Sequence, residues 1–213
     1  MTDLYRLDAT ARDVAVRFGA QAGADPWQGG VVGPGGYAPV IVRGRDRMRR
    51  LVPRQWGVPP PPRVAAASGP PVLHVRNLES PFWIGTLRQP EMRCLVPATA
   101  FRKWGRAQDL ATGCRMPHWL GLAGVPPDLA GPPLFALAGI WRDSEVPSFA
   151  LLSCAPNRLI GAGVGAAAMP VILHAEDHET WLAASWKEAC PLVAPFPSQH
   201  MARLPGIPSE PCG

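Results

Sequence analysis

Alternating apolar and polar residues, interrupted by prolines, dominate the sequence between residues 74 and 104. Alternation of this kind is typical of strands that bury one face, and it predicts strands at residues 73–76 and 94–101. Pro81 and Pro90 lie between these two segments and mark turns. A chain with this pattern at its centre is expected to fold around a half-buried sheet.

Weaker strand and helix signals lie on both sides of this region. Asp8 or Thr10 can cap a helix that extends to about Phe18 and ends at Gly19. Residues 106–133 carry turn signals and predict a surface excursion between strands. The other predicted elements are strands at residues 4–7, 134–141 and 148–154, a hairpin of residues 40–42 and 48–52, and a helix from residue 176 to 183 or 184.

These elements predict a single domain of the α+β class, built mainly from antiparallel strands with a few short helices. The 213 residues are enough to bury a sizeable core, and the domain is expected at residues 1–190. The proline-rich residues 191–213 predict an irregular tail. No apolar run approaches the ~20 residues that span a membrane, so a cytoplasmic protein without a membrane partner is expected.

Five cysteines are spread along the chain without a CxxC pair. Their odd number and wide spacing argue against a disulfide framework and against a zinc ribbon. His174 and His178 stand four residues apart, which could place two metal ligands on one helix face. No third ligand is evident, so a capping or surface role is favoured, and neither a metal nor another cofactor is predicted.

Arginine supplies almost all of the positive charge, with 19 arginines against the two lysines Lys103 and Lys187 and a net charge of +5. Seven arginines fall between residues 43 and 63, close to Trp56. The guanidinium binds phosphate and an indole can stack on a base, so the cluster predicts a surface for single-stranded DNA. A solvated hairpin explains the same charges. The DNA-binding residues predicted from this pattern are Arg43, Arg49, Arg50, Arg54, Trp56, Arg63 and Trp83.

Five motifs resemble, in order, those of the SOS-response-associated peptidase (SRAP) or abasic-site-processing family. They are Trp56-Gly57 before a run of prolines, Asn77 in its turn, residues 93–98 followed by Phe101 and Trp104, residues 139–141, and residues 169–173. The resemblance extends from residue 1 to about residue 185 and covers most of the chain. It implies a barrel-like sheet and DNA as the partner.

The resemblance also implies a mechanism. In the family, an exposed N-terminal cysteine condenses with the aldehyde of an abasic site in single-stranded DNA and closes a thiazolidine, while an asparagine, a glutamate and a histidine assist. In this chain the cysteine position holds Thr2, and the glutamate position holds Lys103. The histidine falls on Gly165 or Ala166, and Asn77 matches the asparagine, which is also expected to contact DNA. These positions are expected to converge at one concave site.

The substitutions leave three functional hypotheses. A threonine hydroxyl ionises far above a thiol and cannot close a thiazolidine, so the first is an inactive or altered paralogue that binds single-stranded or abasic DNA. The second is an abasic-site cross-linker or lyase that uses the amine of Thr2 or Lys103 to form a Schiff base. The third is an interaction scaffold of phage-related origin that does not bind DNA.

Overall fold

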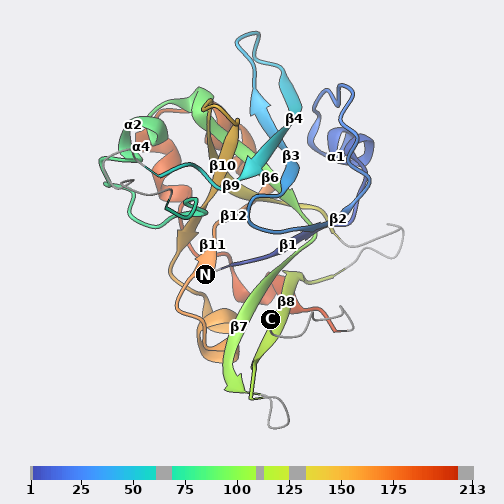
Figure 1. The fold of residues 1–213 in the computed structure, drawn as a ribbon, viewed down its shortest axis with the longest axis vertical. Helices are drawn as coiled ribbons and strands as arrows, with labels where there is room; N and C mark the ends of the chain where they lie inside the picture. Colours follow the sequence, from blue (N-terminus) through green and yellow to red (C-terminus); the bar gives the residue numbers. More distant parts are fainter. Residues whose placement is uncertain (1, 61–68, 109–112, 125–132, 206–213) are drawn as a thin grey trace.

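Two β-sheets form the body of the protein, and the computed structural model describes residues 2–60, 69–108, 113–124 and 133–205 of it (Figure 1). The smaller sheet has the strand order β13-β8-β7-β1-β2, and its described pairings are antiparallel. Its strands are β1 (Tyr5–Leu7), β2 (Gly30–Val32), β7 (Ala100–Gln108), β8 (Arg115–Leu122) and β13 (Met201–Arg203).

The larger sheet has the strand order β11-β10-β4-β3-β6-β9-β12, with β5 paired to β10. Its strands are β3 (Tyr37–Arg43), β4 (Arg49–Trp56), β5 (His74–Val75), β6 (Arg93–Ala98), β9 (Phe135–Arg142), β10 (Ser148–Cys154), β11 (Met169–Pro170) and β12 (Ile172–Leu173). Because β10 pairs with β9 as well as with β4, the five strands β10-β4-β3-β6-β9 close into a ring. The predicted α+β class and barrel-like sheet are confirmed.

Short helices lie around the sheets. They are α1 (Ala11–Phe18), α2 (Ile84–Leu87), α3 (His178–Ala183) and α4 (Trp186–Ala189), with the 3-10 turns η1 (Pro90–Met92), η3 (Ala175–Asp177), η4 (Cys190–Leu192) and η5 (Ser198–His200) and the π-helical turn η2 (Leu159–Val164). Among the described residues, no helix has the length and apolar character needed to cross a membrane.

The predicted first helix and hairpin are confirmed. Thr10 is the N-cap of α1 and forms a reciprocal capping box with Asp13, while Gly19 ends the helix in the left-handed region (φ 61°). The hairpin is longer than expected: β3 and β4 pair from Arg43 and Arg49 at the turn back to Tyr37 and Gln55. Local capping and turn chemistry was therefore sufficient to place both elements.

The strand expected at residues 94–101 is two strands that belong to different sheets. β6 ends at Ala98 and β7 begins at Ala100, so Thr99 lies at the crossing between the sheets. The Thr99 hydroxyl accepts a hydrogen bond from the backbone N–H of Asp8 (3.1 Å) and ties the crossing to the end of β1. Because β1 pairs with β7, the N-terminal residues lie along β7.

The surface excursion expected at residues 106–133 is wrong for Arg115–Leu122, which forms β8 and pairs with β7. Trp119 and Leu120 are buried there. Gly121 resembles a strand breaker in the sequence. In the structure a β-carbon at Gly121 would lie 2.9 Å from the carbonyl oxygen of Thr99, so the close approach of the chains requires glycine.

The segment expected to be an irregular tail contributes a strand. Residues 201–203 of β13 pair with residues 120–122 of β8. Sheet structure therefore continues past residue 190, while residues 206–213 lie outside the described part of the chain.

Two buried apolar clusters cover the two faces of the larger sheet. Val40 and Val96 belong to one cluster, whereas their neighbours Ile41 and Leu95 belong to the other. Successive strand residues point to opposite faces, which explains this division. The second cluster also receives the buried face of α1 and Trp181 of α3.

Candidate functional site

The N-terminal segment lies beside β7. The backbone N–H of Arg102 donates to the carbonyl oxygen of Leu4 (2.9 Å). The Asp3 carboxylate pairs with the guanidinium of Arg102 (2.8 Å) and accepts a hydrogen bond from the indole N–H of Trp104. These contacts hold Thr2 next to β7, with its side chain buried.

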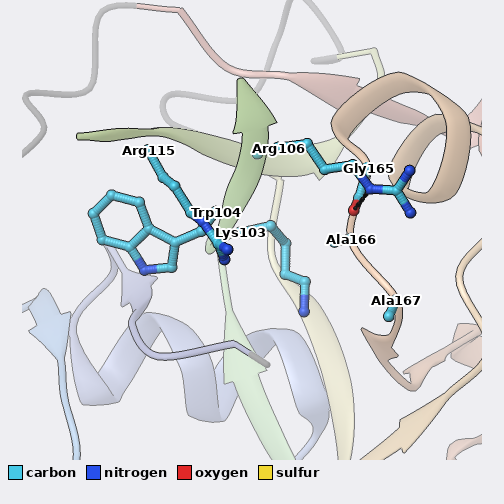
Figure 2. Close-up of a pocket in the computed structure, with 8 residues that line it drawn as sticks. Lys103, Trp104, Arg106, Arg115, Gly165, Ala166 and Ala167 are labelled. Carbon is cyan, nitrogen blue, oxygen red and sulfur yellow. Dashed lines mark hydrogen bonds between the residues drawn. The ribbon is translucent and has the colours of Figure 1, made fainter. Parts of the chain in front are cut away.

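Lys103 lines a pocket of about 660 Å³, and its side chain extends toward the segment that follows η2 (Figure 2). The other lining residues are Trp104, Gly105, Arg106, Arg115, Gly165, Ala166 and Ala167. Lys103 is only 2% exposed, and its Nζ makes no hydrogen bond or ion pair with any residue that the structure describes. The pocket therefore contains an amine without a fixed partner in the described chain.

The Lys103 amine is partly neutral near physiological pH. Burial lowers its pKa to about 8, while Asp3 and Cys154 oppose the shift. About a tenth of such an amine is neutral at pH 7, against roughly 0.04% for an ordinary lysine. A neutral amine that opens onto a pocket can act as a nucleophile.

The pocket wall opposite Lys103 carries no large side chain. Gly165 ends η2 with a φ of 82°, and its carbonyl oxygen accepts a hydrogen bond from Nε of Arg106 (3.1 Å). A β-carbon at Gly165 would lie 2.7 Å from Cγ of Arg106, so a larger residue would displace the Arg106 side chain. Neither Gly165 nor Ala166, the two positions matched to the family's histidine, can transfer a proton.

His74, at the start of β5, interacts electrostatically with Lys103 and Asp3. It is 7% exposed, its ring lies edge-on to that of Trp56 (5.8 Å between centroids), and neither ring nitrogen has a partner among the described residues. Burial and then the charge of Lys103 lower the pKa of His74 to about 4, while Asp3 opposes them. His74 is therefore a neutral imidazole at pH 7, able to give or accept one hydrogen bond at each nitrogen.

Asn77 is not among the residues that line the Lys103 pocket. It is exposed in the turn after β5, where its side-chain oxygen accepts the backbone N–H of Glu79 (3.0 Å). A role for Asn77 at the site stays a prediction. Sequence reasoning missed His74, which lies three residues before Asn77 in β5. Both residues of this strand are buried, so alternation gave no signal for the histidine.

Thr2 and His74 both leave buried polar atoms without a hydrogen-bond partner in the described chain: the Thr2 hydroxyl and both ring nitrogens of His74. Other such atoms, including the indole nitrogens of Trp27 and Trp119, are spread over the rest of the fold. Leaving such a group without a partner costs about 1–3 kcal/mol, so the Thr2 and His74 atoms are candidates for contact with a bound polar group.

The sequence model of the SOS response associated peptidase (SRAP) family matches residues 3–205. The chain belongs to this family. Two solved structures from Bordetella bronchiseptica share the fold. The first protein is 20% identical to this chain, and the match covers 94% of this chain and 97% of the Bordetella protein, with a TM-score of 0.71. The other, described as phage-related, is 18% identical and covers 96% and 94%, with a TM-score of 0.69. No curated protein matches the sequence.

Most arginines predicted to bind DNA on the SRAP scaffold are already engaged. Arg43 and Arg49 both pair with Glu179 (3.2 and 3.1 Å), and Arg50 pairs with Asp46. The guanidinium of Arg54 lies 4.7 Å from the ring centre of Trp141. Arg63 lies outside the described residues.

The tryptophans predicted to stack bases are core residues. Trp56 is 0% exposed, and its indole N–H donates to the carbonyl oxygen of Leu73 (3.1 Å). Trp83 is 4% exposed. Neither ring offers a face to a base in this structure. The half-buried Trp104 and the exposed Arg106 and Arg115 of the pocket are the alternatives that sequence reasoning did not single out.

Proposed function

We propose that this SRAP-family chain binds single-stranded or abasic DNA at the Lys103 pocket and forms no heat-stable cross-link with it. The observation that supports DNA binding is the pocket itself: Lys103, Arg106 and Arg115 line it beside Trp104. Cations bind phosphates and an indole can stack on a base, so the lining suits a nucleotide chain. The proposal includes a cytoplasmic location, where such DNA is found.

The proposed absence of a stable cross-link rests on the thiols. Thr2 supplies a hydroxyl where the family has a thiol. Cys154 is the thiol whose charge interacts with that of Lys103. Burial raises the pKa of Cys154 to about 11. Burial also raises the pKa of Cys94, far above neutral pH. Neither residue supplies a thiolate at pH 7, so neither replaces the missing nucleophile.

A second candidate function is reversible, amine-dependent reaction with the aldehyde of an abasic site, favoured by the buried and unpaired Lys103. The Nζ lone pair adds to the carbonyl carbon, the carbonyl oxygen takes up a proton, and the resulting carbinolamine loses water to give a protonated imine. His74 fits the role of proton carrier, because it is neutral and its nitrogens are unpartnered in the described chain. The amine of a chain that begins at Thr2 is the alternative nucleophile.

The DNA-binding proposal is tested by titrating a fluorescent single strand with protein at several salt concentrations. Each neutralised phosphate contributes a slope of about 0.7 in log affinity against log salt. Replacing Arg106 and Arg115 by glutamine is expected to reduce the slope by about 1–2 units and the low-salt affinity by about tenfold. The matched control replaces Arg49 and Arg50, whose guanidinium groups are paired with carboxylates.

Two outcomes would contradict this proposal. A larger loss in the Arg49/Arg50 variant would place the strand along the hairpin instead of the pocket. Absence of binding even at low salt would leave the third hypothesis, an SRAP-fold interaction scaffold, for which the phage-related description of one structural neighbour is the available support.

A further inference from the structure

A second cavity, of about 280 Å³, shares no lining residue with the Lys103 pocket. It lies where the end of α1 and the start of β4 meet β12, the η3–α3 turn and the segment before η5. Phe135, Leu173 and Phe196 are among its apolar walls. A concave pocket with apolar walls and a few polar groups is the usual form of a small-molecule site. In this cavity polar and apolar atoms share the lining about equally.

Two histidines of this cavity are held by aromatic stacking. The His174 ring stacks on Phe196 (4.5 Å between centroids, 30° between planes), and the His178 ring stacks on Phe18 (5.4 Å, 29°). His178 is 8% exposed, and its Nε2 has no partner among the described residues. Burial, followed by the charges of Arg49 and Arg17, lowers the pKa of His178 to about 4, whereas the charge of Glu176 opposes this shift. The imidazole is neutral at pH 7 and can donate one N–H.

The two arginines of the cavity differ in their availability. Arg49 is already engaged, because it donates to the carbonyl oxygen of Phe18 (3.1 Å) and pairs with Glu179 (3.1 Å). Arg17 lines the same cavity from the last turn of α1 and pairs with no carboxylate in the described chain. One exposed cation that lines the cavity is therefore available to a ligand.

We propose that this cavity binds a small organic monoanion, with its carboxylate between Arg17 and Nε2 of His178 and its apolar body against Phe135, Leu173 and Phe196. A carboxylate accepts both donors in a charge-assisted bond. Inorganic phosphate fits less well, since it has no apolar body and its second charge would find Arg49 already engaged. The site is separate from the Lys103 pocket and does not depend on DNA binding.

Hexanoate is the probe for this proposal, and NMR of the full chain is the measurement. Addition of hexanoate is expected to shift Nε2 of His178 and the amides of β12 and α3 saturably, with a dissociation constant of about 1 mM for a ligand of this size. Hexan-1-ol, which keeps the apolar body, and inorganic phosphate, which keeps the charge, are each expected to bind at least about tenfold more weakly.

Three variants locate the ligand. His178→Phe preserves the stack on Phe18 but removes the donor, and Arg17→Gln removes the charge at an exposed position. Each is expected to weaken hexanoate about tenfold, as loss of one charge-assisted contact predicts. Arg12→Gln, an exposed α1 residue outside the cavity, is the control and is expected to leave the affinity unchanged.

Several results would overturn the proposal. They are a failure of hexanoate to saturate by about 10 mM, equal binding of hexan-1-ol or phosphate, or an unchanged affinity in Arg17→Gln. If His178→Phe has a lower melting temperature than the wild type, the hexanoate affinity of the Arg17→Gln variant is the test. DNA titration of the same variants keeps this result separate from the proposed function, because neither residue lines the Lys103 pocket.

Discussion

The β3–β4 hairpin and the Lys103 pocket are both rich in cations, but they hold them differently. On the hairpin, Arg43 and Arg49 share Glu179 and Arg50 binds Asp46. Around the pocket, Lys103 and Arg115 pair with no carboxylate that the structure describes. The hairpin has more arginines, and carboxylates hold three of them, while Arg45 and Arg47 at its turn are exposed and pair with no carboxylate in the described chain. Charge density along a sequence thus predicts the composition of a surface, whereas folding decides which charges remain available to a ligand.

The largest expected effect is the loss of borohydride trapping when the Lys103 amine is removed from the pocket. Borohydride reduces an imine to a stable amine, so it should trap wild-type protein on an abasic single strand. Lys103→Met is expected to reduce trapping by at least about 10²-fold if Lys103 is the nucleophile. The control is Lys187→Met, which alters the only other lysine, exposed on α4. Mass spectrometry of the reduced product identifies the modified residue.

The same assay tests the altered-paralogue proposal. Without reductant, the wild type should give no cross-link that survives heating. Thr2→Cys restores a thiol and should cross-link slowly, and the addition of Lys103→Glu should accelerate it by roughly 10²–10⁴-fold through general acid–base assistance. A heat-stable product from the unmodified chain would contradict the proposal. A modified N-terminal amine in place of Lys103 would move the nucleophile to Thr2.

The unsatisfied imidazole of His74 predicts that the stability of the protein depends on pH. Its pKa of about 4 lies below the ordinary value near 6.5, so the unfolded chain binds more protons than the folded chain between these values. The stability due to His74 is therefore complete above about pH 6.5 and decreases as the pH falls toward 4. Between pH 7 and pH 5 the loss is about 2 kcal/mol.

Urea denaturation at the two pH values measures this loss. His74→Gln should lose about 2 kcal/mol less than the wild type on acidification, because the titrating group is gone. The part of the acid sensitivity due to His178, whose pKa is also lowered to about 4, should remain. An identical loss in both proteins would show that His74 titrates normally and is not buried beside Lys103.

The parts of the fold that were predictable depend on local chemistry. Thr10 and Gly19 fix the ends of α1 through caps, and the alternation of β3 and β4 fixes their faces. β8 was missed because Gly121 acts through a contact with Thr99, 22 positions away in sequence. Propensity describes such a glycine as a breaker, although the packed structure requires it.

The candidate site shows the same division between local and long-range information. The motif match predicted that Thr2, Asn77, Lys103 and Gly165 or Ala166 converge. The structure brings Lys103, Gly165 and Ala166 around one pocket, whereas neither Thr2 nor Asn77 lines it. The motif match did not single out His74, because burial and electrostatic contact with Lys103 arise only when β5 packs beside β10. A histidine in a short strand carries no signal of that contact in the sequence.

The smallest expected effect comes from Glu179, and it tests the comparison most directly. Glu179→Gln removes the carboxylate that Arg43 and Arg49 share, which increases the positive charge of the hairpin by one unit. Both arginine side chains are about a quarter exposed and the glutamate is half exposed, so stability should change by less than about 1 kcal/mol. If DNA lies in the pocket, its affinity at low salt should rise by less than about threefold, since screening weakens the new charge within a Debye length of about 10 Å. Fluorescence anisotropy at low salt measures the change. A tenfold gain would mean that the strand contacts the hairpin and that Glu179 suppresses binding there, and the original arginine cluster would then be the DNA surface.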